Sequence, residues 1–150
     1  MKNWRERIIG VLTLGGSAIG LAAIVSEVPI LTLRGLSLLI IATFAVVFIY
    51  GIVVGVLVIE KAEKSLLLAL PFWLAQVPVL QSAWITYGLY TGAKFDILFG
   101  SDLNINFVWS GGTHFTFYLF PGDAGAVGVN VVAIAISYMI IRNQKDVVAS

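Results

Sequence analysis

The chain contains no cysteine, and histidine occurs once, at His114. The lack of cysteine excludes disulfide bonds, thiolate nucleophiles and zinc sites built on thiolates. Charged residues are also scarce, at 11% of the chain, and the net charge of +1 provides little attraction for nucleic acid. Hydrophobic residues make up 59% and the mean hydropathy is +0.99, values far from those of an average soluble domain. The composition therefore indicates a membrane protein.

Charge is absent from four long stretches, which contain no Asp, Glu, Lys, Arg or His. These stretches cover residues 8–25, 36–59, 65–90 and 124–141. A helix needs about 20 apolar residues to cross a hydrocarbon core of about 30 Å. The sequence therefore predicts an all-α membrane protein, with four transmembrane helices that form a single integral domain in the lipid bilayer. The usual groups of catalysis and ion translocation are then missing from the membrane interior.

The basic residues lie mainly in the segments that precede, connect and follow these stretches on one side of the predicted bundle. Seven of the nine are found there: Lys2, Arg5, Arg7, Lys61, Lys64, Arg142 and Lys145. Because cytoplasmic loops carry an excess of basic residues, this asymmetry predicts a cell (inner) membrane protein with both termini in the cytoplasm. Residues 91–122 are then outside the membrane, and Asp123 is placed to cap the N-terminus of the fourth helix.

Small residues recur four apart in the first two predicted helices. Gly16 and Gly20 form one such pair, and Gly51 and Gly55 form the second. Glycines at this spacing leave a flat helix face, on which another helix backbone can approach closely. The pattern predicts a helix-packing interface, and it fits two arrangements. The partner helix belongs either to the same chain or to another molecule.

The third apolar stretch combines helix-breaking and polar residues. Pro71 and Pro78 are seven residues apart and each removes a backbone hydrogen bond, and Gln76 and Gln81 are the two amides of this stretch. Together with Asn130 of the fourth stretch, the two amides are candidates for a polar path across the membrane. The alternative is that the amides satisfy backbone carbonyls or bridge neighbouring helices.

The segment at about residues 95–120 is long enough to form a structure outside the membrane. Two runs of alternating or aromatic residues surround Gly111-Gly112, which predicts a β-hairpin between the third and fourth helices, with a primed turn at these glycines. In this register Trp109 opposes His114. Because an isolated hairpin is marginal in water, this one is expected to lie on the bundle, on the bilayer surface with its aromatic residues at headgroup level, or on a partner protein. The candidate partner surface consists of Trp109, Phe115, Phe117 and Tyr118.

Candidate catalytic or cofactor-binding groups do not come together in the sequence. His114 has no second histidine or cysteine with which to form a metal site, and the spacing of the acidic residues matches no ligand motif. Ser110 and His114 lack an orienting acid. Gly111-Gly112 lacks the lysine of a phosphate-binding loop. We therefore assign no catalytic residue, no metal and no cofactor.

The sequence is most consistent with a non-enzymatic accessory or scaffold subunit. Such a protein would bind another membrane protein, or a second copy of itself, through the small-residue helix faces and the aromatic hairpin. Two alternatives remain at this stage. One is a small channel or transport component with a polar path along the third helix, and the other is an immunity-type protein that blocks a membrane-targeted toxin.

Overall fold

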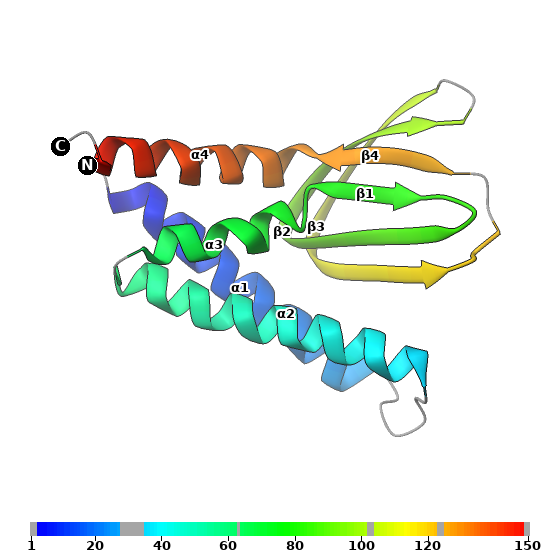
Figure 1. Ribbon diagram of the computed structural model, residues 1–150, viewed down its shortest axis with the longest axis horizontal. Coiled ribbons are helices and arrows are strands. Elements are labelled where there is room, and N and C mark those ends of the chain that lie inside the picture. The colour runs from blue at the N-terminus through cyan, green and yellow to red at the C-terminus, as the bar shows by residue number, and fades with distance from the viewer. Residues whose placement is uncertain (1–2, 28–34, 63, 102–103, 123–124, 149–150) are drawn as a thin grey trace.

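The computed structural model describes residues 3–27, 35–62, 64–101, 104–122 and 125–148, with the side chains of the last helix described as far as Asn143. Figure 1 shows helices at one end of the molecule and a sheet at the other. The elements follow in the order α1 (Asn3–Glu27), α2 (Leu36–Ile59), α3 (Ser65–Leu74), β1 (Pro78–Gln81), β2 (Ile85–Gly100), β3 (Ile105–Leu119), β4 (Ala126–Asn130) and α4 (Val131–Val148).

The prediction of an all-α four-helix bundle is wrong. Within the described residues, α1 and α2 are the helices long and apolar enough to cross a membrane, and they coincide closely with the first two predicted spans. The third predicted span is divided between α3, β1 and the start of β2, and the fourth is divided between β4 and the first part of α4. The fold therefore joins a helical half to a curled antiparallel sheet of four strands.

The third predicted span, residues 65–90, fails as a single helix because of its prolines and its composition. Helix α3 ends at Leu74, one turn after Pro71, and Pro78 then disfavours a helical backbone at the residue before it. Beyond this point β-branched and aromatic residues dominate, which favours strands. The chain accordingly turns through residues 75–77 and continues as β1 and then β2.

The fourth predicted span, residues 124–141, begins as β4, and its helix starts only at Val131. The side chain of Asn130 explains this boundary, because its Oδ1 accepts hydrogen bonds from the backbone N–H groups of Val132 at 3.1 Å and Ala133 at 3.4 Å. These are the groups that an N-cap residue satisfies. Asp123, the predicted cap, lies outside the described residues.

The hairpin is also longer than predicted and turns elsewhere. Strand β3 is continuous through Gly111-Gly112, and it pairs along its whole length with β2. Trp109 therefore opposes Phe95 rather than His114, which opposes Tyr90. The glycines allow a bend instead of a turn, because a continuous partner strand of the same length is available in β2.

That bend folds the β2–β3 hairpin back on itself. Gly92 of β2 lies opposite Gly112 of β3, and both have a positive φ, at +81° and +113°. Only glycine adopts such values without steric cost. We name the two halves by their residues: the first arm holds residues 85–91 and 113–119, and the second arm holds residues 93–100 and 105–111. Figure 1 shows both arms running away from α3 and α4, while α2 continues alongside the sheet.

The last strand closes the sheet between the two arms. Strand β4 pairs with β1 on one side and with residues 96–100 of the second arm on the other. Strand β1 also pairs with the start of the first arm, at Leu80↔Tyr87 and Gln81↔Thr86. The sheet thus curls, and β3 forms its outermost strand in both arms.

The helical half has a close-packed apolar core. Ile9 of α1, Val54 of α2, Trp73 of α3 and Ile140 of α4 are all nearly inaccessible to solvent and lie in one cluster. The indole Nε1 of Trp73 donates a hydrogen bond of 2.9 Å to Thr13 Oγ1, so this buried ring has its polar group satisfied. All four helices therefore contribute to one interior, with the sheet continuing from it.

The arrangement of the helices brings described basic residues to one end of the molecule. They belong to the start of α1, the turn between α2 and α3, and the last turns of α4, which all lie at the end opposite the sheet (Figure 1). These residues are Arg5, Arg7, Lys61, Lys64 and Arg142. The opposite end carries Trp84 and Phe120, which are exposed and pack edge to face at 5.9 Å.

Candidate functional site

The glycines of the predicted helix-packing interface are used within the chain. A Cβ atom on Gly55 would lie 2.6 Å from the backbone nitrogen of Leu14, and one on Gly51 would overlap the hydroxyl of Ser17. On α1, a Cβ on Gly20 would meet the ring of Phe48, and one on Gly16 would meet Thr91 of the sheet. These faces are therefore covered by α1, α2 and β2 of the same molecule, which leaves them unavailable to a partner.

Gln76, the first residue of the predicted polar path, is fully buried in a satisfied hydrogen-bond network. Its Oε1 accepts hydrogen bonds from the backbone N–H of Thr91 at 2.9 Å and from the Thr91 hydroxyl at 3.0 Å. Its Nε2 donates to the carbonyl of Phe72 at 3.3 Å. The amide thereby joins the end of α3 to the first arm, just before the bend.

The other two path residues lie elsewhere. Asn130 caps α4, as described above, and is 1% exposed. Gln81 is an exposed residue at the end of β1. The structure thus brings Gln76 and Asn130 into separate hydrogen bonds, one set with the first arm and α3 and the other with the start of α4.

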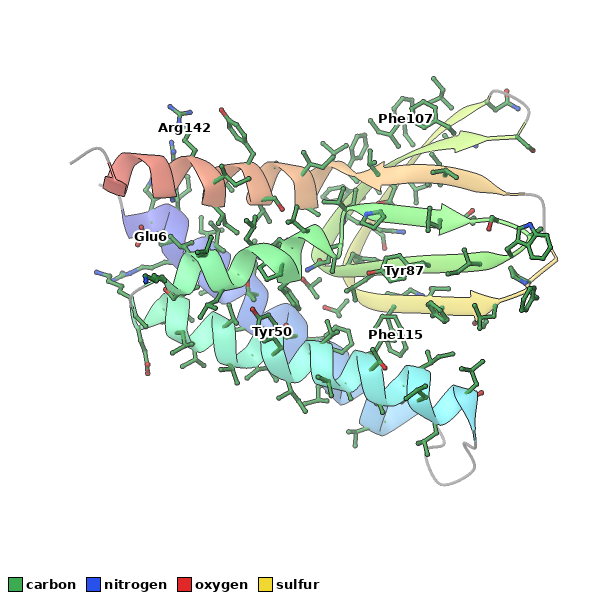
Figure 2. All side chains as sticks on the ribbon, in the orientation of Figure 1. Glu6, Tyr50, Tyr87, Phe107, Phe115 and Arg142 are labelled. Carbon is green, nitrogen blue, oxygen red and sulfur yellow. The ribbon has the colours of Figure 1, made fainter. Side chains whose placement is uncertain are left out.

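Two of the predicted partner-surface residues are half-buried and pack against α2. The ring of Phe115 stacks on Phe44 of α2 with centroids 4.6 Å apart, and it meets Phe48 edge-on. Phe117 contacts Phe44 as well, at 6.5 Å. Figure 2 shows Phe115 between the first arm and α2. The candidate partner surface was predicted to contact another protein or the membrane surface, and the helix hairpin packs against these two of its rings.

The other two residues, Trp109 and Tyr118, are exposed but do not share a surface. Tyr118 pairs with Thr86 in the first arm, whereas Trp109 pairs with Phe95 in the second. Side chains alternate between the two faces of a strand, so Phe115, Phe117 and Trp109, which are all odd-numbered, point to the same face of β3. We call this face the outer face, and Tyr118 points to the opposite, inner face. Trp109 therefore belongs to a different feature.

That feature is the outer face of the second arm with the adjoining β4. Cross-strand pairs place apolar side chains of three strands side by side, and each is more than half exposed. We call this set the second-arm face: Phe99, Ile105, Phe107, Trp109 and Val127. Figure 2 shows Phe107 projecting on the side of the second arm away from α1 and α2. The helix hairpin covers the corresponding face of the first arm only.

The inner face of the sheet has the opposite character. Between the two arms lies a pocket of about 80 Å³, lined mainly by polar side chains. Lys94 and Asp96 form an ion pair of 2.8 Å there, and the Lys94 ammonium also lies over the ring of Tyr90, 4.8 Å from its centroid. Tyr90 shares a 3.1 Å hydrogen bond with Ser110, and the His114 ring lies 6.0 Å from that of Tyr90.

The chemistry of this pocket is that of a buried charge pair. Asp96 is 1% exposed, and its Oδ1 has no hydrogen-bond partner among the described residues, while Lys94 remains 21% exposed. The His114 Nε2 is engaged by Thr116 at 2.8 Å, so no base–nucleophile pair with an orienting acid is formed. Among the described residues, no three His, Asp or Glu side chains gather as metal ligands.

Sequence reasoning missed this cluster, although a signal was present. Tyr90, Lys94, Asp96 and Leu98 share a parity and alternate with Phe95, Ile97 and Phe99, as expected of a strand with one polar and one apolar face. The chain matches no known protein family, no curated protein and no solved structure.

Proposed function

We propose that this protein is a non-enzymatic integral membrane subunit that binds another membrane protein through the second-arm face. The single observation that carries the proposal is the exposure of the Trp109 ring, 69% accessible on an apolar three-stranded face that the helices leave uncovered. Exposed apolar patches of this kind mark interaction sites.

Membrane insertion is supported by the lengths of the four apolar stretches in their observed conformations. Residues 131–141 of α4 rise about 16 Å at 1.5 Å per residue, and the five residues of β4 add about 16 Å at 3.3 Å per residue. Helix α3 and β1 give about 28 Å in the same way, before the turn between them is added. Each composite segment thus matches a hydrocarbon core of about 30 Å.

The polarity of the curled sheet fits the same placement. Its outer face is apolar and its inner face polar, which is the alternation of strands that meet lipid or protein outside and water inside. Trp84 and Phe120 at the far end, and Trp4 beside Arg5 at the other, suit the two interfaces. With the basic end in the cytoplasm, both termini are cytoplasmic and the sheet occupies the outer leaflet of the cell membrane.

A protein partner explains the second-arm face better than lipid alone. Trp109 pairs with Phe95, which precedes Asp96, and Asp96 pairs with Asn130 at the junction of β4 and α4. The Trp109 ring therefore lies near mid-depth of the composite segment. Tryptophan concentrates at membrane interfaces rather than at the bilayer centre, whereas it is enriched in protein–protein hot spots. Its position favours a protein contact.

Co-purification from native membranes tests this proposal. Phe107→Ser with Trp109→Ser should insert and fold, because neither side chain is buried, and should lose the co-purified partner. The matched control is Trp84→Ser with Phe120→Ser, which removes an equally exposed aromatic pair at the far end. Equal partner recovery with all three proteins would refute the proposed surface.

The channel and immunity alternatives remain predictions that no particular contact favours. The residues of the predicted path, Gln76 and Asn130, have their hydrogen-bonding groups directed to the backbone of the same chain. Flux measurements in liposomes are the direct test of the transport alternative.

A further inference from the structure

Strand β3 is the edge of the sheet, and in the second arm this edge is uncovered. Among the described residues its hydrogen-bonded neighbour there is β2 alone, whereas β2 lies between β3 and β4. Edge strands are normally protected against pairing by charged residues or proline. Residues 105–119 contain no Asp, Glu, Lys, Arg or Pro. The sequence of β3 therefore carries none of the usual safeguards against strand addition.

The hydrogen bonds at both ends of the β2–β3 ladder show which backbone groups point outward. The N–H of Gly100 donates to Asn104 O at 2.9 Å, and the N–H of Phe120 donates to Trp84 O at 2.8 Å. The register between these ends is unbroken. Because hydrogen-bonded pairs alternate with non-hydrogen-bonded pairs in an antiparallel ladder, the even-numbered residues of β3 bond to β2. The odd-numbered residues direct their N–H and C=O groups away from it.

In the second arm these odd-numbered residues are Ile105, Phe107, Trp109 and Gly111, and the first three belong to the second-arm face. The same residues whose side chains form the second-arm face thus also present unpaired backbone groups along the open edge. Backbone groups that lie at membrane depth have to be paired, since hydrocarbon offers no donors or acceptors. A strand added here would receive both a hydrogen-bonded ladder and an apolar neighbour.

We propose that this edge pairs with the same edge of a second copy of the chain, antiparallel and centred on Phe107. A two-fold axis through Phe107 makes Ile105 face Trp109 of the second copy, and the outward N–H and C=O groups of all three residues then meet acceptors and donors. The edge is self-complementary, because it is apolar on its outer side and contains no charge that would face its own copy. This inference rests on the membrane placement in the proposed function, but it does not require the partner protein proposed there.

Cysteine cross-linking tests the register, and the chain offers a clean background because it has no cysteine. Phe107→Cys in native membranes should form a disulfide-linked dimer on mild oxidation, because residues that face each other as a hydrogen-bonded pair have Cα atoms about 5.5 Å apart. Val108→Cys is the matched control, since its side chain points to the inner face and faces residue 106 of the second copy. Co-expressed Ile105→Cys and Trp109→Cys chains should cross-link to each other more than either does alone.

Proline substitution separates the backbone contribution from the side chain. Phe107→Pro removes an outward N–H and leaves the β2–β3 ladder intact, whereas Phe107→Ser removes the ring alone. In nanodiscs, we expect Phe107→Pro to dimerise at least about tenfold more weakly than Phe107→Ser, as the loss of the hydrogen bonds shared by two symmetric sites implies. Val108→Pro should instead lower the melting temperature, since its N–H belongs to the ladder.

The cross-linking experiment would overturn the inference if positions 107 and 108 cross-linked equally, or if position 107 did not cross-link in native membranes. The substitution experiment would overturn it if Phe107→Pro left the dimer affinity unchanged. A loss of affinity in Phe107→Ser alone would have the same meaning, because it would assign association to the side chains rather than to the backbone edge. The inference is tested by measuring dimer formation, and the proposed function is tested by measuring recovery of the partner protein. Either can therefore fail while the other holds.

Discussion

Replacing Gln76 with leucine should destabilise the protein by about 2–4 kcal/mol, because the change removes the acceptor of two buried donors. The backbone N–H and the hydroxyl of Thr91 both donate to Gln76 Oε1, and Thr91 is itself 1% exposed. An unsatisfied buried donor costs about 1–3 kcal/mol, and the additional apolar burial of leucine offsets part of the sum of the two.

The carbonyl of Phe72 loses a donor in the same variant. In a regular helix the carbonyl of Phe72 would accept a hydrogen bond from the backbone N–H of Gln76. Here that N–H donates to Trp73 O at 3.1 Å, and the side-chain Nε2 of Gln76 donates to the Phe72 carbonyl instead. The matched control is Gln81→Leu, the same substitution at an exposed position, which should change stability by less than about 0.5 kcal/mol.

Reversible unfolding in detergent, followed by the fluorescence of the tryptophans, measures both variants. A loss below about 1 kcal/mol in Gln76→Leu would show that the Thr91 network does not hold the first arm to α3. Loss of solute flux in liposomes at unchanged stability would refute the structural role altogether and return the amide to the transport alternative.

Three other changes test separate contacts. Gly55→Leu should prevent folding rather than abolish association alone, because a Cβ there would press on the backbone of α1 at 2.6 Å; a folded monomer in circular dichroism would contradict this. Phe115→Ala should lower the stability measured by thermal denaturation by about 2–3 kcal/mol, because it removes the stack on Phe44. This cost is smaller than that of a fully buried phenylalanine, since Phe115 is only partly buried, and recovery of the partner should be unchanged. Asp96→Ala should cost about 1–3 kcal/mol by removing the 2.8 Å partner of Lys94, and Lys94→Met should rescue part of that loss in the double variant.

The sequence was informative about where apolar segments begin and end, and less so about their conformation. Helix α2 is found at residues 36–59 as predicted, because this stretch is uniformly apolar and contains no proline. Residues 65–90 and 124–141 have the right lengths for spans, but hydropathy does not distinguish a helix from a helix followed by a buried strand. Pro78 was the available signal in residues 65–90, because β-branched residues are at least as frequent in α2, which is helical.

The residues of the candidate site are brought together by pairing between β2 and β3, and this made the site harder to predict from the sequence than the helices. Gly111-Gly112 predicts a turn locally, and only the presence of an equally long β2 with Gly92 opposite makes it a bend. Lys94 meets both Asp96 and, across that bend, Tyr90, so the alternation along β2 indicates a polar face but not the pocket that the bend forms. Trp109 was predicted to belong to a partner surface because it lies in an aromatic-rich segment. The contact of Phe115 with α2 could not be predicted, because it joins two segments that are far apart in the sequence.

The position of β4 also has a consequence for biosynthesis. It lies between β1 and the second arm, yet it is the last strand to leave the ribosome. A chain synthesised as far as residue 122 has all the partners of β4 but no strand between them, so the sheet cannot close until the C-terminal segment has been inserted. Such non-local assembly is slow. During that interval the edges of β1 and β2 that β4 later joins are unpaired, and unpaired edges of this kind expose a partly assembled sheet to incorrect pairing.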